Sequence, residues 1–213
     1  MNALEQALRS QFGSNALDKI QATRIGIAGA GGLGSNCAVH LVRCGFKQLI
    51  IVDFDRVEPS NLNRQFFFNS QVGNPKVDML KDNLLAVNPD LDLNIIHGKI
   101  DRTNIRDFFN GCDIIVEAFD QARDKKMIIE TYAGSEKLLV SASGIAGWGN
   151  SDDIIIHRAG KNFILIGDLV SETSDSLPPA SPRVGIAAAK QADVILSHVI
   201  GENTKTPERR TDP

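Results

Sequence analysis

A glycine-rich motif with the spacing G-x-G-x-x-G lies early in the chain, at residues 29–34. Backbone N–H groups in such a loop, together with the dipole of a helix that follows it, bind a phosphate group. Asp53 stands about twenty residues further on, where a carboxylate accepts hydrogen bonds from ribose hydroxyls. The motif alone also suits a structural turn, because glycine permits close packing of a helix on a strand. Together these features predict a nucleotide site built from Gly29, Gly31, Gly32, Leu33, Gly34 and Asp53.

A polar segment with several cations follows Asp53, DFDRVEPSNLNRQ at residues 53–65, and Lys76 comes soon after it. A nicotinamide enzyme never cleaves its pyrophosphate, so an arginine and a lysine aimed at it gain little. Attack on the α-phosphorus of ATP instead releases a highly charged pyrophosphate, which cations stabilise. Arg64 offers a planar guanidinium, Lys76 a point charge, and Asn61 a hydrogen bond to phosphate or ribose. The alternative for Arg64 and Lys76 is that both are solvated surface charges.

Asp120 is the candidate magnesium ligand. Mg²⁺ accompanies a triphosphate and binds one or two carboxylates plus phosphate oxygens. Asp120 follows a buried strand expected at residues 113–118, so it lies at the carboxyl edge of the sheet, where such folds bind ligands. The alternative is that Asp120 caps the next helix. No zinc is expected, because the three cysteines form no C-x-x-C pair.

Hydrophobic periodicity predicts the elements that position these residues. Helices are expected at residues 3–12, 15–21, 33–44, 76–87, 103–109, 124–135 and 183–200, and strands at 25–28, 49–53, 91–97, 113–118 and 138–141. Alternating strands and helices predict an α/β, Rossmann-like, doubly wound, mostly parallel sheet. Strands at residues 153–157 and 163–166 flank a turn, which predicts antiparallel strands at the C-terminal end. We expect one domain over residues 1–201, with N-terminal helices in 1–22, a loop at 171–182 and a flexible tail at 202–213.

Composition restricts the class of protein. The chain has 213 residues, 42% of them hydrophobic, which suits one α/β domain with a substantial core. Its 23 Lys and Arg against 26 Asp and Glu give a net charge of −3, so no nucleic-acid partner is expected. The N-terminus lacks the apolar segment of a signal peptide, and no apolar run approaches the ~20 residues that span a membrane. We therefore expect a cytoplasmic protein with no membrane association.

These motifs, in this order, resemble the ThiF/MoeB family of adenylyltransferases, relatives of the ubiquitin-activating enzymes. The resemblance is carried by GAGGLGS at residues 29–35, VDFDRVEPSNLNRQ at 52–65, GNPKV at 73–77 and the strand that leads to Asp120. It extends from the N-terminal helix to residue 200. Within the family, the sequence is most similar to the short ThiF-type proteins of thiamine biosynthesis.

The resemblance implies an enzyme that uses ATP and Mg²⁺ to adenylate a ubiquitin-like sulfur carrier protein with a C-terminal Gly-Gly. The terminal carboxylate of the carrier attacks the α-phosphate and gives acyl-adenylate plus pyrophosphate. Carried over by motif, the nucleotide-binding and catalytic positions are Asp53, Asp55, Asn61, Arg64, Gln65 and Lys76, with Asp120 on magnesium. The family also supplies an arginine from the N-terminal helix of a partner subunit. Arg9 is the nearest match, which implies a homodimer.

The carboxylate chemistry agrees with the residues. A carboxylate is already ionised near pH 7, so the reaction needs no general base and depends on alignment and charge neutralisation. After Cys112 the chain has no cysteine, so the loop at 171–182 forms no thioester, and a separate sulfur donor is expected. That loop would then cover the tail of the carrier. Small residues at 143–149 suggest a floor for a Gly-Gly tail, in which Trp148 is either a contact or a core residue.

Other functions are compatible with these residues. A molybdopterin-type carrier, or a relative that modifies tRNA, would use the same nucleotide motifs. An NAD-dependent oxidoreductase would explain the glycine motif and Asp53 but would leave Arg64, Lys76 and Asp120 without a role. A non-catalytic module would bind ATP without turnover.

Overall fold

A seven-stranded sheet forms the centre of the structure, a computed structural model that describes residues 1–202. The strand order is β3-β2-β1-β4-β5-β7-β6. The strands are β1 (Arg24–Ala28), β2 (Gln48–Asp53), β3 (Asp92–His97), β4 (Ile114–Glu117), β5 (Leu138–Ala142), β6 (Ile155–Arg158) and β7 (Phe163–Gly167). All neighbouring pairs are parallel except β6 with β7. The predicted doubly wound α/β sheet is therefore confirmed, with β6 as its antiparallel edge strand.

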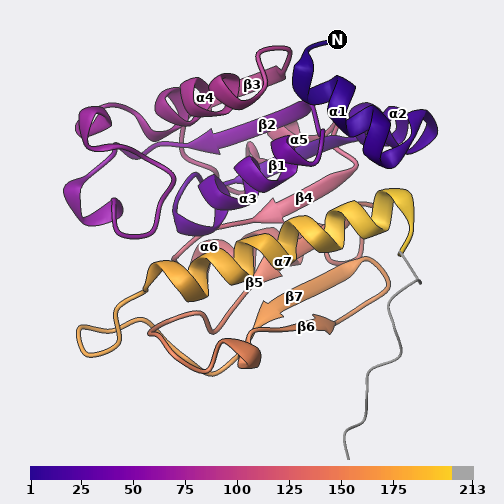
Figure 1. The fold of residues 1–213 in the computed structure, drawn as a ribbon. Coiled ribbons are helices and arrows are strands. Elements are labelled where there is room, and N and C mark those ends of the chain that lie inside the picture. The colour runs from indigo at the N-terminus through magenta and orange to yellow at the C-terminus, as the bar shows by residue number, and fades with distance from the viewer. Residues whose placement is uncertain (203–213) are drawn as a thin grey trace, which may run out of the picture.

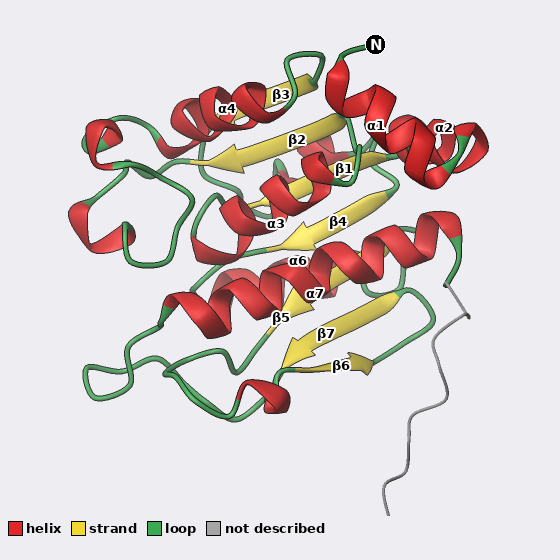
Figure 2. Cartoon of the chain, viewed as in Figure 1, coloured by secondary structure: helices red, strands yellow, loops and turns green. Residues whose placement is uncertain are grey.

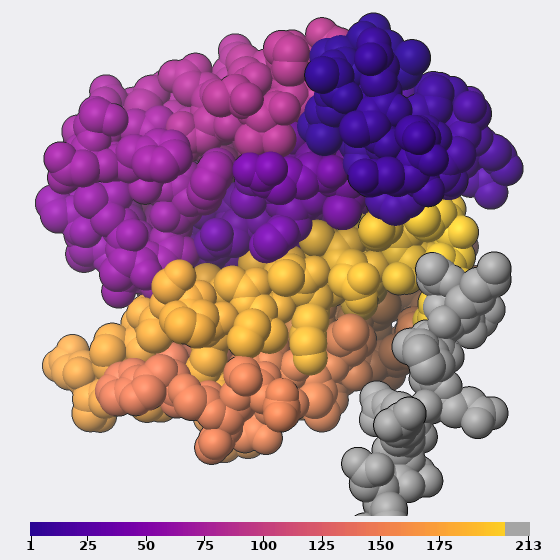
Figure 3. Space-filling model, in the orientation of Figure 1, coloured from indigo at the N-terminus to yellow at the C-terminus, as the bar shows by residue number. Residues whose placement is uncertain are grey.

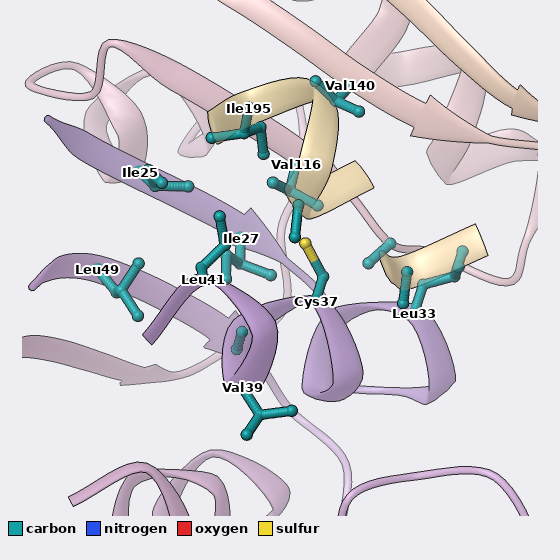
Figure 4. Packing of buried hydrophobic residues seen from close by; sticks show 14 of the residues in the cluster. Ile25, Ile27, Leu33, Cys37, Val39, Leu41, Leu49, Val116, Val140 and Ile195 are labelled. Carbon is teal, nitrogen blue, oxygen red and sulfur yellow. The ribbon is translucent and has the colours of Figure 1, made fainter. Parts of the chain in front are cut away.

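Helices cover both faces of the sheet (Figure 1). One face carries α3 (Gly32–Arg43), α4 (Lys76–Val87) and α7 (Ser181–Ile200), and the other carries α5 (Ile105–Phe109) and α6 (Ala122–Tyr132). Each helix buries an apolar stripe against the sheet, as the periodicity predicts. In the space-filling view, α7 lies between the N-terminal part of the chain and the segment that contains β6 and β7 (Figure 3). The seam between α3 and α7 is part of the larger hydrophobic cluster, where Cys37 packs among Ile27, Val116 and Ile195 (Figure 4).

The two N-terminal helices, α1 (Ala3–Phe12) and α2 (Ser14–Ala22), lie where the strands begin (Figure 1). Asn2 caps α1, because its Oδ1 accepts the N–H of Glu5 at 3.0 Å. A side chain at Gly45, just after α3, would lie 2.9 Å from Leu17 and 3.1 Å from Leu8. Helices α1 and α2 thus pack close to the turn after α3, at the amino end of the sheet and away from the loops that follow the strands.

Some predicted boundaries shift by a few residues, for local reasons. The fifth helix begins at Ile105 and not at residue 103, because Asp101 Oδ1 accepts the N–H groups of Thr103 and Asn104 and keeps them in a turn. The last helix begins at Ser181 with Pro182 in its first turn, so the loop predicted at 171–182 ends at Ala180. The tail predicted at 202–213 lies, from residue 203 on, outside the described residues. Among the helices of residues 1–202, none has the length and apolarity needed to cross a membrane.

Candidate nucleotide site at the carboxyl edge of the sheet

The glycine loop directly follows β1, and long loops leave the same edge of the sheet after β2, β5 and β7 (Figure 2). Gly29 has φ 105°, and a Cβ there would lie 2.8 Å from the carbonyl oxygen of Ala118. A Cβ at Gly34 would lie 1.9 Å from the carbonyl oxygen of Gly29. Only glycine fits at these two positions, because the loop, the strand and the start of α3 are in contact. Gly31 is the N-cap of α3 and no side chain caps this helix, so its N-terminus suits an anion.

Asp53, at the end of β2, joins the glycine loop to the segment that follows. Its Oδ2 accepts the N–H of Ala30 at 2.6 Å, and its Oδ1 accepts the N–H of Asp55 at 2.7 Å. A carboxylate has about four lone-pair sites, so these two bonds leave capacity for ribose hydroxyls. Asp53 therefore positions the loop in addition to its predicted role at the ribose.

The segment around Arg64 packs on the start of α3. Asn36 Nδ2 donates to the carbonyl oxygens of Gly32, at 2.7 Å, and Arg64, at 2.8 Å. Ser35 Oγ accepts the N–H of Phe66 at 3.0 Å. Sequence reasoning did not single out Ser35 or Asn36, although both stand in the first turns of the helix that follows the glycine motif. They are the residues that bring Arg64 beside the glycine loop.

The guanidinium of Arg64 is held by neutral oxygens. Its Nη1 donates to the carbonyl oxygen of Ser60 at 3.0 Å and to Asn63 Oδ1 at 2.8 Å. No carboxylate among residues 1–202 forms an ion pair with Arg64. A side chain at Gly32 would lie 3.7 Å from Arg64 Cγ. The charge of this half-buried arginine is thus available to an anion beside the loop.

Asn61 and Gln65 are both buried, but in different ways. Asn61 Oδ1 accepts the N–H of Glu58 at 3.0 Å and closes the short helix η1 (Pro59–Asn61), so it has a structural role as well as its predicted contact. Gln65 Oε1 is buried and has no hydrogen-bond partner among the described residues. The amide of Gln65 borders Gly31, since a side chain there would lie 3.9 Å from Nε2. A buried acceptor without a donor beside a glycine loop fits a bound polar ligand.

Lys76 reaches the site from the first turn of α4. Its Nζ lies 2.8 Å from Asp55 Oδ2, and its side chain is only 7% exposed. Its backbone N–H donates to the carbonyl oxygen of Asp55 at 2.9 Å. Asp55 and Lys76, both predicted as site residues, therefore form an ion pair, and the alternative that Lys76 is a solvated surface charge is wrong.

Asp120 is exposed in the loop between β4 and α6. The N-cap of α6 is Gln121, so the alternative that Asp120 caps this helix is wrong. The described residues contain no cluster of three or more His, Cys, Asp or Glu side chains that could hold a metal ion. A magnesium ion at Asp120 would therefore need phosphate oxygens as further ligands, which is how Mg²⁺ binds with a nucleotide.

Arg9 is not brought to the site within its own chain. It lies on α1, near the amino end of the sheet, and pairs with Asp18 at 2.9 Å. Any contact of Arg9 with the nucleotide would have to be made in a second subunit.

Two loops beyond β5 and β7 extend this edge. Arg183 is buried and donates to the carbonyl oxygens of Gly149, at 3.0 Å, and Asn150, at 3.2 Å. It also pairs with Asp168. Burial acts to raise the pKa of Asp168, but N–H groups of Ser171 and Val170, the Ser171 hydroxyl and the Arg183 charge outweigh it and lower the pKa. Asp168 and Arg183, which the sequence analysis did not select, hold the two loops together.

The sequence predicts that Trp148 is either a contact for the carrier tail or a core residue. Trp148 is 68% exposed, so it is not a core residue. Leu169 and Val170, in the loop after β7, are exposed as well. The floor predicted at 143–149 is thus accompanied by apolar side chains that face solvent.

The cysteines are packing residues. Cys37 and Cys112 are buried, and Cys44 is partly buried. Burial raises the pKa of the Cys37 thiol, and it raises that of Cys112 to about 11. Neither thiol forms the nucleophilic thiolate near neutral pH.

A doubly wound sheet with a glycine loop, a carboxylate and two cations at its carboxyl edge defines an α/β protein of the nucleotide-binding class. A model of the ThiF family matches residues 4–208. The chain belongs to the ThiF family.

Similar proteins are known from several organisms. SUMO-activating enzyme subunit 2 of Dictyostelium discoideum is 31% identical over 70% of this chain and 22% of that protein. The tRNA threonylcarbamoyladenosine dehydratase of Haemophilus influenzae is 30% identical over 68% of this chain and 56% of that protein. The chain thus spans less than two thirds of either relative. The E. coli dehydratase TcdA, crystallised with AMP, has a TM-score of 0.82 at 19% identity and covers 94% of this chain and 95% of that one, which shows the shared fold.

Proposed function

We propose that the chain is an ATP-dependent adenylyltransferase that activates a carboxylate on a macromolecular substrate. The observation that carries the proposal is the set of groups gathered at one edge: the glycine loop, Asp53, the Arg64 guanidinium, the Lys76–Asp55 pair and Asp120. A dehydrogenase would use the loop and Asp53 alone. Cations beside a phosphate loop serve a reaction in which a phosphoanhydride is broken.

In the proposed reaction, the substrate carboxylate attacks the α-phosphorus of ATP and pyrophosphate leaves. The N-terminus of α3 binds phosphate, and Asp53 binds the ribose. Arg64 and Lys76 neutralise charge that grows on the departing oxygens, and no general base is needed. A magnesium ion held by Asp120 and the phosphates would add to this neutralisation.

The substrate we propose is the C-terminal Gly-Gly carboxylate of a ubiquitin-like sulfur carrier, in the thiazole branch of thiamine biosynthesis. Exposed Trp148, Leu169 and Val170 support a protein partner, because apolar side chains on a surface favour protein contacts. Residues 143–157 and 163–182 contain no Lys or Arg, and the second range contains Asp168, Glu172 and Asp175. Such loops repel a nucleic-acid backbone.

A second candidate is the carboxylate of a modified tRNA nucleoside. It is favoured by the likeness to a tRNA threonylcarbamoyladenosine dehydratase in sequence and to TcdA in fold. The nucleotide edge would be identical in this case, and the difference would lie in the substrate surface.

ATP–pyrophosphate exchange tests both candidates. Purified protein is assayed with Gly-Gly-terminated carriers, with the same carriers lacking Gly-Gly, and with tRNA that carries threonylcarbamoyladenosine. Exchange that depends on the intact Gly-Gly terminus supports the main proposal. Absence of exchange with every carrier would refute the main proposal. Exchange that depends on the modified tRNA would support the second candidate.

Two finer points belong to the same proposal. The sulfur comes from a separate donor, because Cys37 and Cys112 are buried, Cys44 is partly buried on α3, and no cysteine follows Cys112. A reducible covalent adduct with the carrier on a non-reducing gel would contradict this. The active unit is a homodimer in which Arg9 acts across the interface. Mixing Arg9→Ala and Arg64→Ala proteins should then restore exchange through hybrid dimers, whereas mixtures no better than the separate variants would rule it out.

A further inference from the structure

A fully buried carboxylate ends the central strand β4. Glu117 has 0% relative exposure and faces α6, on the opposite side of the sheet from α3 and α7. Lys125 Nζ, on α6, lies 3.1 Å and 3.0 Å from its two oxygens. The hydroxyl of Ser141, on β5, donates to Oε2. The apolar neighbours in this layer include Ile115, Ile128 and Leu139.

The polar cluster of Glu117, Lys125 and Ser141 occupies a layer of the core that apolar side chains would otherwise fill. Removing a carboxylate and most of its lysine partner from water is costly, and apolar side chains of similar volume often give equal or greater stability. Lys125 Nζ also donates to the carbonyl oxygen of Ala142 at 3.0 Å. The pair thus ties together the carboxyl ends of β4 and β5 and the start of α6, the three elements that surround the loop of Asp120.

Glu117 also controls the turn that leads to Asp120. Its Oε1 accepts the N–H of Phe119 at 2.7 Å, so the carboxylate holds the backbone one residue before Asp120. On the other side of the same turn, the Ala118 N–H donates to the Ala28 carbonyl at 3.0 Å.

The same turn forms the wall behind the glycine loop. The closest neighbour of a Cβ at Gly29 would be the Ala118 carbonyl oxygen, at 2.8 Å, and a Cβ at Gly34 would lie 3.2 Å from Ala118 Cβ. Residues 118–120 therefore lie between the buried cluster and the loop that receives phosphate. A shift of the turn would move Asp120 and the wall of the loop together.

We propose that Glu117 is a positioning residue for the nucleotide site. Its ion pair with Lys125 and its bond to the Phe119 N–H fix residues 118–120, so that Asp120 stands where it can bind the magnesium ion of Mg-ATP. The part that concerns magnesium rests on the function proposed above, and the part that concerns the turn rests on the contacts of Glu117.

The chain contains a matched control. Glu5 is another buried carboxylate paired with a lysine, Lys47, at 2.8 Å, with side-chain exposures of 5% and 24%, against 0% and 22% for Glu117 and Lys125. This second pair joins α1 to the loop before β2, at the amino end of the sheet. Glu5→Gln and Glu117→Gln therefore impose a similar change in the core at opposite ends of the strands.

The test compares wild type, Glu117→Gln and Glu5→Gln by calorimetric titration with ATP, at increasing Mg²⁺ concentrations and with Mg²⁺ removed by EDTA. We expect Glu117→Gln to raise the Mg²⁺ concentration for half-maximal ATP binding by about 10-fold or more. This factor corresponds to the loss of one hydrogen bond to a charged group. ATP binding without Mg²⁺ should weaken less than the Mg²⁺ requirement rises, because the Asp53 bond to the Ala30 N–H still holds the glycine loop even when the Ala118 wall shifts. Glu5→Gln should lower Tm similarly but leave the Mg²⁺ dependence unaltered.

Lys125→Arg, which retains the charge, should behave like wild type in the Mg²⁺ titration, and Lys125→Met like Glu117→Gln. If Glu117→Gln fails to fold, Ser141→Ala, which removes one bond to the same carboxylate, should shift the Mg²⁺ dependence in the same direction. A wild-type Mg²⁺ profile in Glu117→Gln or, failing that variant, in Ser141→Ala would overturn the inference. Lack of exchange with all carriers in the wild type would refute the proposed function instead, and the titration needs no carrier.

Discussion

The backbone N–H of Ala30 donates to Asp53 Oδ2 at 2.6 Å, so the carboxylate that ends β2 is hydrogen-bonded directly to the glycine loop that follows β1. The same carboxylate accepts the N–H of Asp55 through Oδ1. This one side chain therefore links the conformation of the glycine loop to the start of the segment that leads to Arg64 and Lys76.

Replacing Asp53 by Ala should weaken ATP binding by about 10- to 150-fold, because it removes charge-assisted hydrogen bonds within the loop as well as the ribose contact. Asp53→Asn should weaken ATP binding less, since the amide retains one carbonyl oxygen as an acceptor. Titration with ATP measures both. Asp92→Ala, an exposed aspartate at the start of β3, is the control and should bind as wild type; equal affinity of Asp53→Ala and wild type would refute the role.

Arg64→Ala should lower the rate of ATP–pyrophosphate exchange by about 10- to 150-fold, because Arg64 supplies a cation beside the loop that no described carboxylate neutralises. Arg56 is the matched control, since it lies in the same segment, is exposed, and its Nη1 donates to the carbonyl oxygen of Gly73. Exchange by Arg56→Ala should stay within about 3-fold of wild type. A rate for Arg64→Ala as high as that of Arg56→Ala would show that the Arg64 charge does not contribute to exchange.

Lys76→Ala should reduce exchange by a similar factor, with a smaller effect on Tm than on rate. Its partner Asp55 has a side chain that is 48% exposed, so water can solvate the carboxylate once the lysine is gone. Lys81→Ala, an exposed lysine further along α4, serves as the control. A loss of Tm that fully accounts for the lost activity would show that Lys76 acts on folding alone.

Asp168 should make the stability of the protein depend on pH in the acidic range. Its pKa is lowered in the folded protein, so its contribution is fully present above the ordinary pKa of Asp and is lost as pH falls through the lower folded value. We expect Tm to fall between about pH 5 and pH 3, and to fall less in Asp168→Asn. Some dependence should remain, because the pKa values of Asp101 and Glu130 are lowered as well.

At pH 7 the prediction concerns Tm itself and not its change with pH. Asp168→Asn leaves the buried guanidinium of Arg183 without its counter-charge, which destabilises the folded protein at neutral pH. The variant should therefore melt well below wild type at neutral pH, and the difference should narrow toward pH 3. Parallel melting curves of wild type and variant across this range would show that Asp168 does not titrate with folding.

Most of this fold could be predicted from the sequence because each helix and strand is indicated by the spacing of apolar residues within that element. Apolar residues at a helical or a strand period must be buried on one side whichever partner covers them, so element types and most boundaries follow from the pattern alone. The same holds for the glycine loop. Its motif is recognisable between a strand and a helix, and the requirement at Gly34 is local, since a Cβ there would meet the carbonyl oxygen of Gly29; at Gly29 the neighbour is the distant Ala118.

The tertiary structure decided what depends on which residues meet across the sheet. Lys76 pairs with Asp55, the N-cap position of α6 is Gln121 and not Asp120, and Trp148 is exposed. Charged and polar side chains are compatible with a surface, a cap or a buried pair, and only the packing of distant segments selects among them. The Glu117–Lys125 and Asp168–Arg183 pairs join different elements, so no period or spacing in the sequence predicts them.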